Sequence, residues 1–267
     1  MATLKRPSLG TDPVSGWAYY ALHEASSYIL KEYFLVGNYQ TCIKNSFKMH
    51  DETKRIVDAF DKAGRSLPNK DYALNHSREV SDWCREVESE GYHELYVHSF
   101  VGMWSAFESG IENTFRDFLL NDREAANRVS TLFGEGNKYP IADWPWDREV
   151  CLEIAQKIES KAKSRTANGG LEFFDRLSTA FSWLGISLSA DSSVKAGLNE
   201  ANRMRNILMH RYGEISQKDA EDFPTFGPWV GKVMPITRGD FDRYYHGISG
   251  ILIAITNGTA RKFGQQG

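Results

Sequence analysis

Apolar side chains recur at every third or fourth position along most of this chain, and this spacing constrains the fold more than any other feature. Each such segment forms one apolar stripe on a helix. The segments cover residues 17–36, 71–90, 92–120, 148–163, 171–184, 194–211 and 240–260. The pattern predicts an all-α protein, an antiparallel helical bundle in which short loops join neighbouring helices.

Two segments interrupt the helical pattern. Residues 133–146 contain two glycines and two prolines, and they predict a long connection. Residues 222–239 contain three prolines and predict an irregular excursion, in which residues 229–235 are the candidate for a short strand. We divide the chain into an N-terminal helical extension, residues 1–90, and a helical domain, residues 91–262. The apolar content of the first ninety residues predicts that they pack onto the rest.

The charge balance excludes a chain-wide attraction to nucleic acid or to an acidic membrane. There are 32 Lys and Arg against 35 Asp and Glu, a formal net charge of −3, so any such partner must bind a local patch. The longest apolar run, residues 248–255, is far shorter than the roughly 20 residues that cross a bilayer. We therefore expect a protein without a membrane span.

The cysteines and the missing motifs narrow the chemistry. The three cysteines, at positions 42, 84 and 151, form no CxxC pair, so we expect neither a zinc site nor a disulfide framework. The N-terminal residues lack the apolar core of a signal peptide, and we expect a reduced, cytoplasmic setting. The sequence contains no phosphate-binding loop, dinucleotide fingerprint, zinc-protease motif or serine-hydrolase motif.

One face of the predicted helix 194–211 carries an unusual set of hydrogen-bonding side chains. With about 100° per residue, roughly a quarter of the helix circumference holds five of them. They are Asn199, Asn202, Arg203, Asn206 and His210. Asparagine is a mediocre helix former, so three asparagines in eight positions need an explanation. Either the stripe bonds to a neighbouring helix, or it faces a polar cleft or a second copy of the same helix.

Residues 205–210, with the sequence RNILMH, match the motif of the HEPN superfamily, in which an arginine is followed by a polar residue and then by a histidine. The context is similar too, because the motif lies late in an amphipathic helix and residues 97–112 resemble the long N-terminal helix of that superfamily. The resemblance covers about residues 92–260. It implies a helical bundle of HEPN type, with the first ninety residues as an extension.

Many HEPN proteins are metal-independent endoribonucleases that act as toxins, antiphage effectors or RNA-processing enzymes, and they work as dimers whose two motifs face one cleft. The resemblance implies that this chain forms a homodimer and cleaves RNA, with tRNA one candidate, to 2′,3′-cyclic phosphate and 5′-hydroxyl ends. It also implies that no cofactor or metal is needed. An antitoxin or another defence-system protein is an implied partner.

The resemblance assigns catalytic roles to three motif residues. An imidazole takes and gives protons near neutral pH, which is the role expected of His210. Arg205 would hold the phosphate and stabilise its developing charge, and Asn206 would orient the imidazole or bind the phosphate. The residues expected to support the site or bind substrate are Asn202, Arg203 and Glu108.

Other interpretations stay open. On an ideal helix Arg205 projects about 140° away from His210. The long arginine side chain could curl part of the way, or a second copy could contribute its arginine or histidine to each centre. Arg205 could instead form a structural salt bridge with Glu108 or Glu112. The chain could also be a non-catalytic HEPN module that binds RNA, a nucleotide or a partner protein, or a purely structural helical scaffold.

Two further groups of residues could contact RNA, although such residues more often cover a solvated face or anchor a loop. The basic group is Lys157, Lys161, Lys163 and Arg165, and the aromatic group is Tyr139, Trp144 and Trp146.

Overall fold

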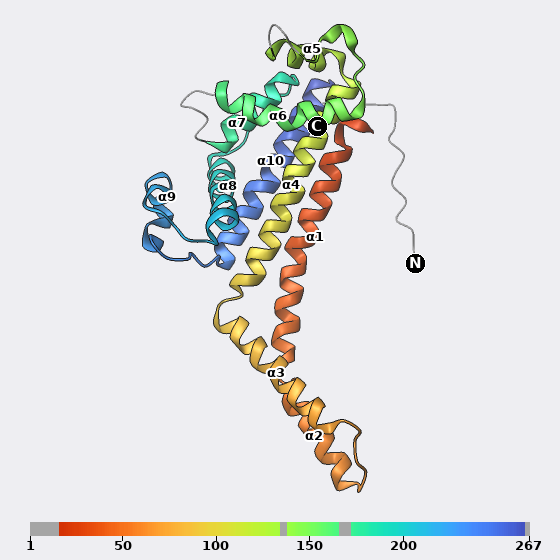
Figure 1. Cartoon of the computed structure of the whole chain (residues 1–267), viewed down its shortest axis with the longest axis vertical. Coiled ribbons are helices and arrows are strands. Elements are labelled where there is room, and N and C mark those ends of the chain that lie inside the picture. The colour runs from red at the N-terminus through yellow and green to blue at the C-terminus, as the bar shows by residue number, and fades with distance from the viewer. Residues whose placement is uncertain (1–15, 134–137, 166–171, 265–267) are drawn as a thin grey trace.

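The computed structural model describes residues 16–133, 138–165 and 172–264, and most of them form helices (Figure 1). Within these ranges, β structure is limited to two isolated bridges. The predicted all-α class is confirmed. The elements are α1 (Trp17–Ser46), α2 (Met49–Lys62), α3 (Lys70–Ser89), α4 (His93–Asn121), α5 (Arg123–Leu132), η1 (Ile141–Asp143), α6 (Arg148–Arg165), α7 (Phe173–Trp183), α8 (Ser192–Arg211), α9 (Gln217–Asp222), η3 (Pro224–Trp229) and α10 (Arg238–Lys262).

Four long helices, α1, α4, α8 and α10, form the body of the molecule (Figure 1). Helices α1 and α8 run in one direction, and α4 and α10 run in the other. Helix α4 packs along α1, and α8 packs along α10. Because the contacting neighbours in both pairs are antiparallel, the predicted antiparallel arrangement is found in the body of the bundle.

Large aromatic side chains fill the centre of the bundle. Phe100, Trp104 and Phe107 of α4 are at most 1% exposed, and so are Phe241 and Tyr244 of α10. Each fully buried side chain of this size stabilises the fold by about 1.5–3 kcal/mol. The same apolar core continues into α1, so this helix packs onto the rest as predicted. The proposed domain boundary after residue 90 stays a prediction.

Helices α2 and α3 form a hairpin that extends beyond one end of the bundle, opposite the end that carries α5, α6 and α7 (Figure 1). Its own core is small and includes Val57 and Cys84, whereas Val87 belongs to the core of the bundle. The side chain of Ser81 accepts a hydrogen bond from the backbone of His50, at an N–O distance of 3.1 Å. The hairpin is therefore held mainly by contacts between its two helices and reaches the bundle through α1.

Glycines let α8 and α10 approach closely. A Cβ atom placed on Gly247 would lie 2.5 Å from the backbone nitrogen of Leu198, and one on Gly197 would lie 2.9 Å from the carbonyl oxygen of Arg243. Such separations are too short for any side chain. The two helices therefore cross with their backbones nearly in contact, and this contact fixes the position of α8.

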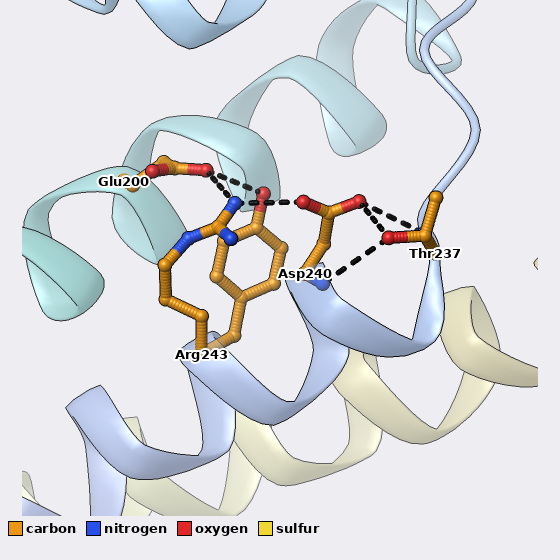
Figure 2. A network of polar contacts seen from close by, with 5 residues as sticks. Glu200, Thr237, Asp240 and Arg243 are labelled. Atoms are coloured by element: carbon orange, nitrogen blue, oxygen red, sulfur yellow. Dashed lines mark hydrogen bonds and ion pairs between the residues drawn. The ribbon is translucent and has the colours of Figure 1, made fainter.

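A network of charged groups also joins α8 to α10 (Figure 2). The Nη2 atom of Arg243 lies 2.7 Å from Oε1 of Glu200 and 2.7 Å from Oδ1 of Asp240. The Tyr244 hydroxyl also donates to Glu200, at 3.2 Å. Asp240 in turn caps the start of α10, because its carboxylate accepts from the backbone N–H and the hydroxyl of Thr237. The network ties the start of α10 to the middle of α8.

Several helix limits differ from the predictions. Helix α1 runs ten residues beyond the predicted end at residue 36, and α2 and α5 were not predicted. The candidate strand over residues 229–235 is wrong, because only Val230 and Val233 form isolated bridges there. Part of the connection predicted over 133–146, residues 134–137, lies outside the described residues. The rest of it contains the short helix η1.

Candidate active site

The motif helix α8 has a buried face and a polar face. Leu198, Ala201, Met204 and Ile207 are fully buried. The helix ends at Tyr212, which takes a left-handed conformation with φ of 53°. The polar stripe lies on the side of the helix opposite these buried residues, and it faces α7, α9 and solvent.

Arg205 is held by two oxygens. Its Nη2 atom lies 3.0 Å from Oε2 of Glu108 on α4, and its Nη1 atom donates to Oδ1 of Asn206 at 3.1 Å. The two charged side chains remain 29% and 40% exposed, so water and a ligand can reach them. An ion pair this open adds little to stability, at most about 1 kcal/mol. Its main effect is to fix the direction of the guanidinium.

His210 lies in the last turn of α8 and is exposed. Within the described ranges it forms no hydrogen bond or ion pair with Arg205, Asn206 or Glu108. The structure thus brings together Arg205, Asn206 and Glu108, and it leaves His210 apart from them on the same helix.

Arg203 has a partner that the sequence did not reveal. Its Nη2 atom lies 2.6 Å from Oδ1 of Asp219, whose other oxygen lies 2.6 Å from Nη2 of Arg211. Asp219 is fully buried and also accepts hydrogen bonds from Ser216 at the start of α9. Burial would raise the pKa of this carboxyl, but the hydrogen bonds from Ser216 and Arg211 and the charge of Arg203 lower it. The carboxylate clamps α9 onto the second half of α8.

A cleft of about 520 Å³ lies beside the polar stripe, between α6, α7, α8 and α9. Asn202 and Asn206 contribute to its wall, as does Arg203. Their side chains are partly exposed. All three asparagines of the stripe, including Asn199, line this polar cleft, which is one of the explanations that the sequence left open.

The third asparagine has a structural role. The Oδ1 atom of Asn199 accepts a hydrogen bond from the backbone N–H of Phe174 at 2.9 Å, and its Nδ2 donates to the Glu172 carboxylate at 3.0 Å. Asn199 thus satisfies a free backbone group in the first turn of α7 and joins that helix to α8. Here the alternative explanation, a bond to a neighbouring helix, is correct.

Glu112 lies one turn from Glu108 on α4 and does not pair with Arg205 among the described contacts. Both glutamates line a small pocket of about 80 Å³ together with Glu159 and apolar side chains. Burial raises the pKa of Glu112, and the negative charges of Glu108 and Glu159 raise it further. Of the two glutamates considered as partners, Arg205 binds Glu108.

Most side chains of the basic group and of the aromatic group that could contact RNA bond to other parts of this chain. The indole N–H groups of Trp144 and Trp146 donate to backbone carbonyls, and Tyr139 is 4% exposed. Tyr139 and Trp146 are therefore buried inside the connection, where bases could not stack on them, whereas Trp144 is anchored but partly exposed. Three of the basic residues are also engaged, Lys157 with Glu153 and Tyr139, Lys161 with the Phe133 ring, and Arg165 with the carbonyl of Leu132.

Lys163 differs from the other members of the basic group because it lines the cleft. Sequence reasoning missed several residues of the cleft wall, among them Lys218 and Phe223. Both lie in the segment after α8, which has no helical periodicity. A usable signal was the Ser-x-x-Asp pattern over residues 216–219, because a capping box marks the start of a helix there.

No protein-family model, no curated protein and no solved structure matches this chain. None of the helices that the structure describes is long and apolar enough to cross a bilayer.

Proposed function

We propose that this chain is a metal-independent endoribonuclease of HEPN type, with Arg205, Asn206 and His210 at its catalytic centre. The observation that carries the proposal is the setting of Arg205. Its guanidinium is oriented by Glu108 and Asn206, yet it stays open to solvent on the helix that ends with the exposed His210. Two of its five N–H donors are used, and the others are available to a phosphate.

The chemistry follows from these groups. An imidazole takes the proton of a ribose 2′-hydroxyl, and the 2′-oxygen attacks the adjacent phosphorus. The bond from phosphorus to the 5′-oxygen breaks, and the leaving oxygen takes up a proton from water or from the imidazolium that has just formed. The products are a 2′,3′-cyclic phosphate and a 5′-hydroxyl end. Arg205 stabilises the negative charge that develops on the phosphate oxygens.

The proposal includes a homodimer. Arg205 bonds Glu108 and Asn206 rather than His210, and on an ideal helix the arginine and the histidine project about 140° apart. In the proposed dimer, each reacting phosphate takes the arginine of one copy and the histidine of the other. Two copies of α8 meeting near their C-terminal ends would form two such centres with closed twofold symmetry. Sedimentation of the intact chain tests this directly, because a monomer at the concentrations that support cleavage would rule out the shared centre.

Incubation of the whole chain with tRNA or total RNA in EDTA tests the activity. We expect cleavage to persist in EDTA and to be lost in His210→Ala and in Arg205→Ala. The control is Lys232→Ala, a change of an exposed side chain outside the proposed centre, which should retain activity. Dependence on a divalent metal, or full activity of the His210→Ala variant, would overturn the proposal.

A toxin or antiphage role is the biological setting we propose for this activity. Expression of the wild-type chain should then arrest bacterial growth, and the His210→Ala chain should not.

The second candidate function is a non-catalytic module that binds RNA, a nucleotide or a partner protein. The ion pair between Arg205 and Glu108 favours this non-catalytic function, because arginine–glutamate pairs of this kind also occur where they only join two helices. RNA that stays intact with the wild-type chain would support the non-catalytic function.

A further inference from the structure

The cleft between α6, α7, α8 and α9 has the dimensions of a site for one nucleotide. Its volume is about 520 Å³, within the range of roughly 300–1,000 Å³ that is usual for small-ligand sites. It adjoins the proposed catalytic centre, because Asn206 belongs to both. A group bound in the cleft would therefore lie next to the phosphodiester that Arg205 holds.

The charges of the cleft favour an anion. Its two carboxylates are engaged within the protein, Glu172 with Asn199, and Asp222 with Arg203 at 3.6 Å. By contrast, Lys163 and Lys218 are exposed and form no ion pair with any residue that the structure describes. Two ammonium groups on opposite elements, α6 and α9, are thus available to phosphate oxygens.

The remaining wall suits a base. Phe223 is partly exposed at the cleft, and the ring of Phe226 supports it from within at a centroid distance of 5.5 Å. An aromatic ring held in this way can stack on a base. The amide of Asn202 has no hydrogen-bond partner among the described residues, so it can both donate to and accept from a base edge.

We propose that this cleft binds one unpaired nucleotide of the RNA strand, adjacent to the phosphodiester that is cut. The inference rests on the proposed function, which supplies RNA as the ligand. Lys163 and Lys218 bind the phosphate, Phe223 stacks on the base, and Asn202 contacts the base edge. The cleft holds one nucleotide and a paired base is stacked in its duplex, so the substrate class is single-stranded RNA.

The experiment measures binding of a 5′-labelled single-stranded RNA by fluorescence anisotropy, with every variant built in the full-length His210→Ala chain so that no RNA is cut. We expect Lys218→Glu to raise the dissociation constant about tenfold, because it removes a phosphate contact and adds a like charge. The matched control is Lys54→Glu, the same charge reversal at an exposed lysine of α2, and it should change affinity less than twofold.

Two further arms define the ligand. The same RNA annealed into a duplex should bind at least about tenfold more weakly, and adenosine monophosphate should compete only weakly with the single strand. Phe223→Leu should weaken binding about fivefold, and circular dichroism verifies its fold. Asn202→Ala provides an independent test, because the Asn202 side chain forms no hydrogen bond with any described residue. We expect it to weaken binding about threefold to tenfold, and unchanged affinity would contradict the contact with the base edge.

The outcomes separate this inference from the proposed function. If the wild-type chain cuts RNA while Lys218→Glu binds RNA as well as Lys54→Glu does, the nucleotide cleft is wrong and the nuclease stands. If the chain does not cut RNA but Lys218→Glu loses affinity, the nuclease is wrong and the cleft stands as an RNA site. Equal binding of duplex and single strand, or tight binding of the mononucleotide alone, would overturn the assignment to single-stranded RNA.

Discussion

Arg205 on α8 and Glu108 on α4 are 97 residues apart in sequence, and their charged groups lie 3.0 Å apart. Because both side chains are partly exposed, the pair contributes at most about 1 kcal/mol to stability. Its effect on function is expected to be larger. A guanidinium that loses this carboxylate is free to change its direction, and misplacement by about 1 Å can reduce a rate a hundredfold.

We therefore predict that Glu108→Gln lowers the rate of RNA cleavage by about tenfold or more while changing the free energy of unfolding by less than about 1 kcal/mol. Cleavage rates and urea titrations of the same samples measure both effects. Glu79→Gln, at an exposed glutamate of α3, is the control and should alter neither quantity. Unchanged cleavage in Glu108→Gln would show that the ion pair is only structural.

Asp219→Asn should destabilise the protein strongly. The variant leaves Arg203 and Arg211 without the buried carboxylate that binds both of them. Loss of one partner from a buried ion pair typically costs about 3–5 kcal/mol, and the partial exposure of the two arginines places the expected value near the lower limit. The measurement is the midpoint of urea unfolding. A loss below about 1 kcal/mol would mean that water replaces the carboxylate at little cost.

The same carboxylate predicts a pH dependence. Interactions with Ser216, Arg211 and Arg203 lower its pKa below the ordinary value of 3.8, despite burial. A lowered folded-state pKa means that the carboxylate stabilises the fold at pH values above about 3.8, and that this contribution is lost as the pH falls through the folded-state value. The stability gap between wild type and Asp219→Asn should thus be constant from about pH 7 to pH 5 and shrink below about pH 4.

Urea titrations across this range provide the measurement. Asp58→Asn, at an exposed carboxylate of α2, is the matched control, and its stability gap should stay small at every pH. A gap for Asp219→Asn that grew in acid would contradict the assignment.

How far the sequence predicts this molecule depends on whether an element has an apolar stripe. Helix α4 has one over its whole length and was predicted within a few residues. Helices α2 and α5 are amphipathic but short and bury few large side chains, α2 only Val57, so they were overlooked. The end of α1 was missed because its last ten residues pack little and carry mixed side chains.

The candidate site also has parts that the sequence predicts and parts that it does not. The polar stripe on α8 could be predicted from the sequence because a single helix sets its geometry. The pairing of Arg205 with Glu108 was one of the alternatives considered. The partner of Arg203 could not be predicted, because Asp219 lies in a segment that has no helical pattern in its sequence. This segment contacts α8 only in the folded protein. The role of Asn199 was hidden for a similar reason, since its partners begin another helix.

Replacement of glycine by alanine should have opposite effects at Gly247, where α8 and α10 cross, and at Gly37, which lies on α1 away from this crossing. Gly247→Ala places a methyl group 2.5 Å from the backbone of Leu198, so the helices must separate, and we expect a loss of about 2 kcal/mol. Gly37→Ala on α1 meets nothing within 4 Å and removes a flexible residue from a helix, so it should gain about 0.5–1 kcal/mol. Thermal unfolding of both variants checks the signs. Equal effects would show that α8 and α10 do not approach as closely as described.

The cysteines predict a thiol titration with a definite count. Cys42 is exposed, whereas Cys84 and Cys151 are buried. Burial raises the pKa of the Cys151 thiol to about 11, with a smaller contribution from the charge of Asp147, so this thiol stays protonated and unreactive at pH 8. A disulfide reagent should therefore modify one thiol of the native chain rapidly and all three after denaturation. In Cys42→Ser the rapid reaction should vanish, and a rapidly reacting thiol in that variant would mean that the bundle opens around Cys84 or Cys151.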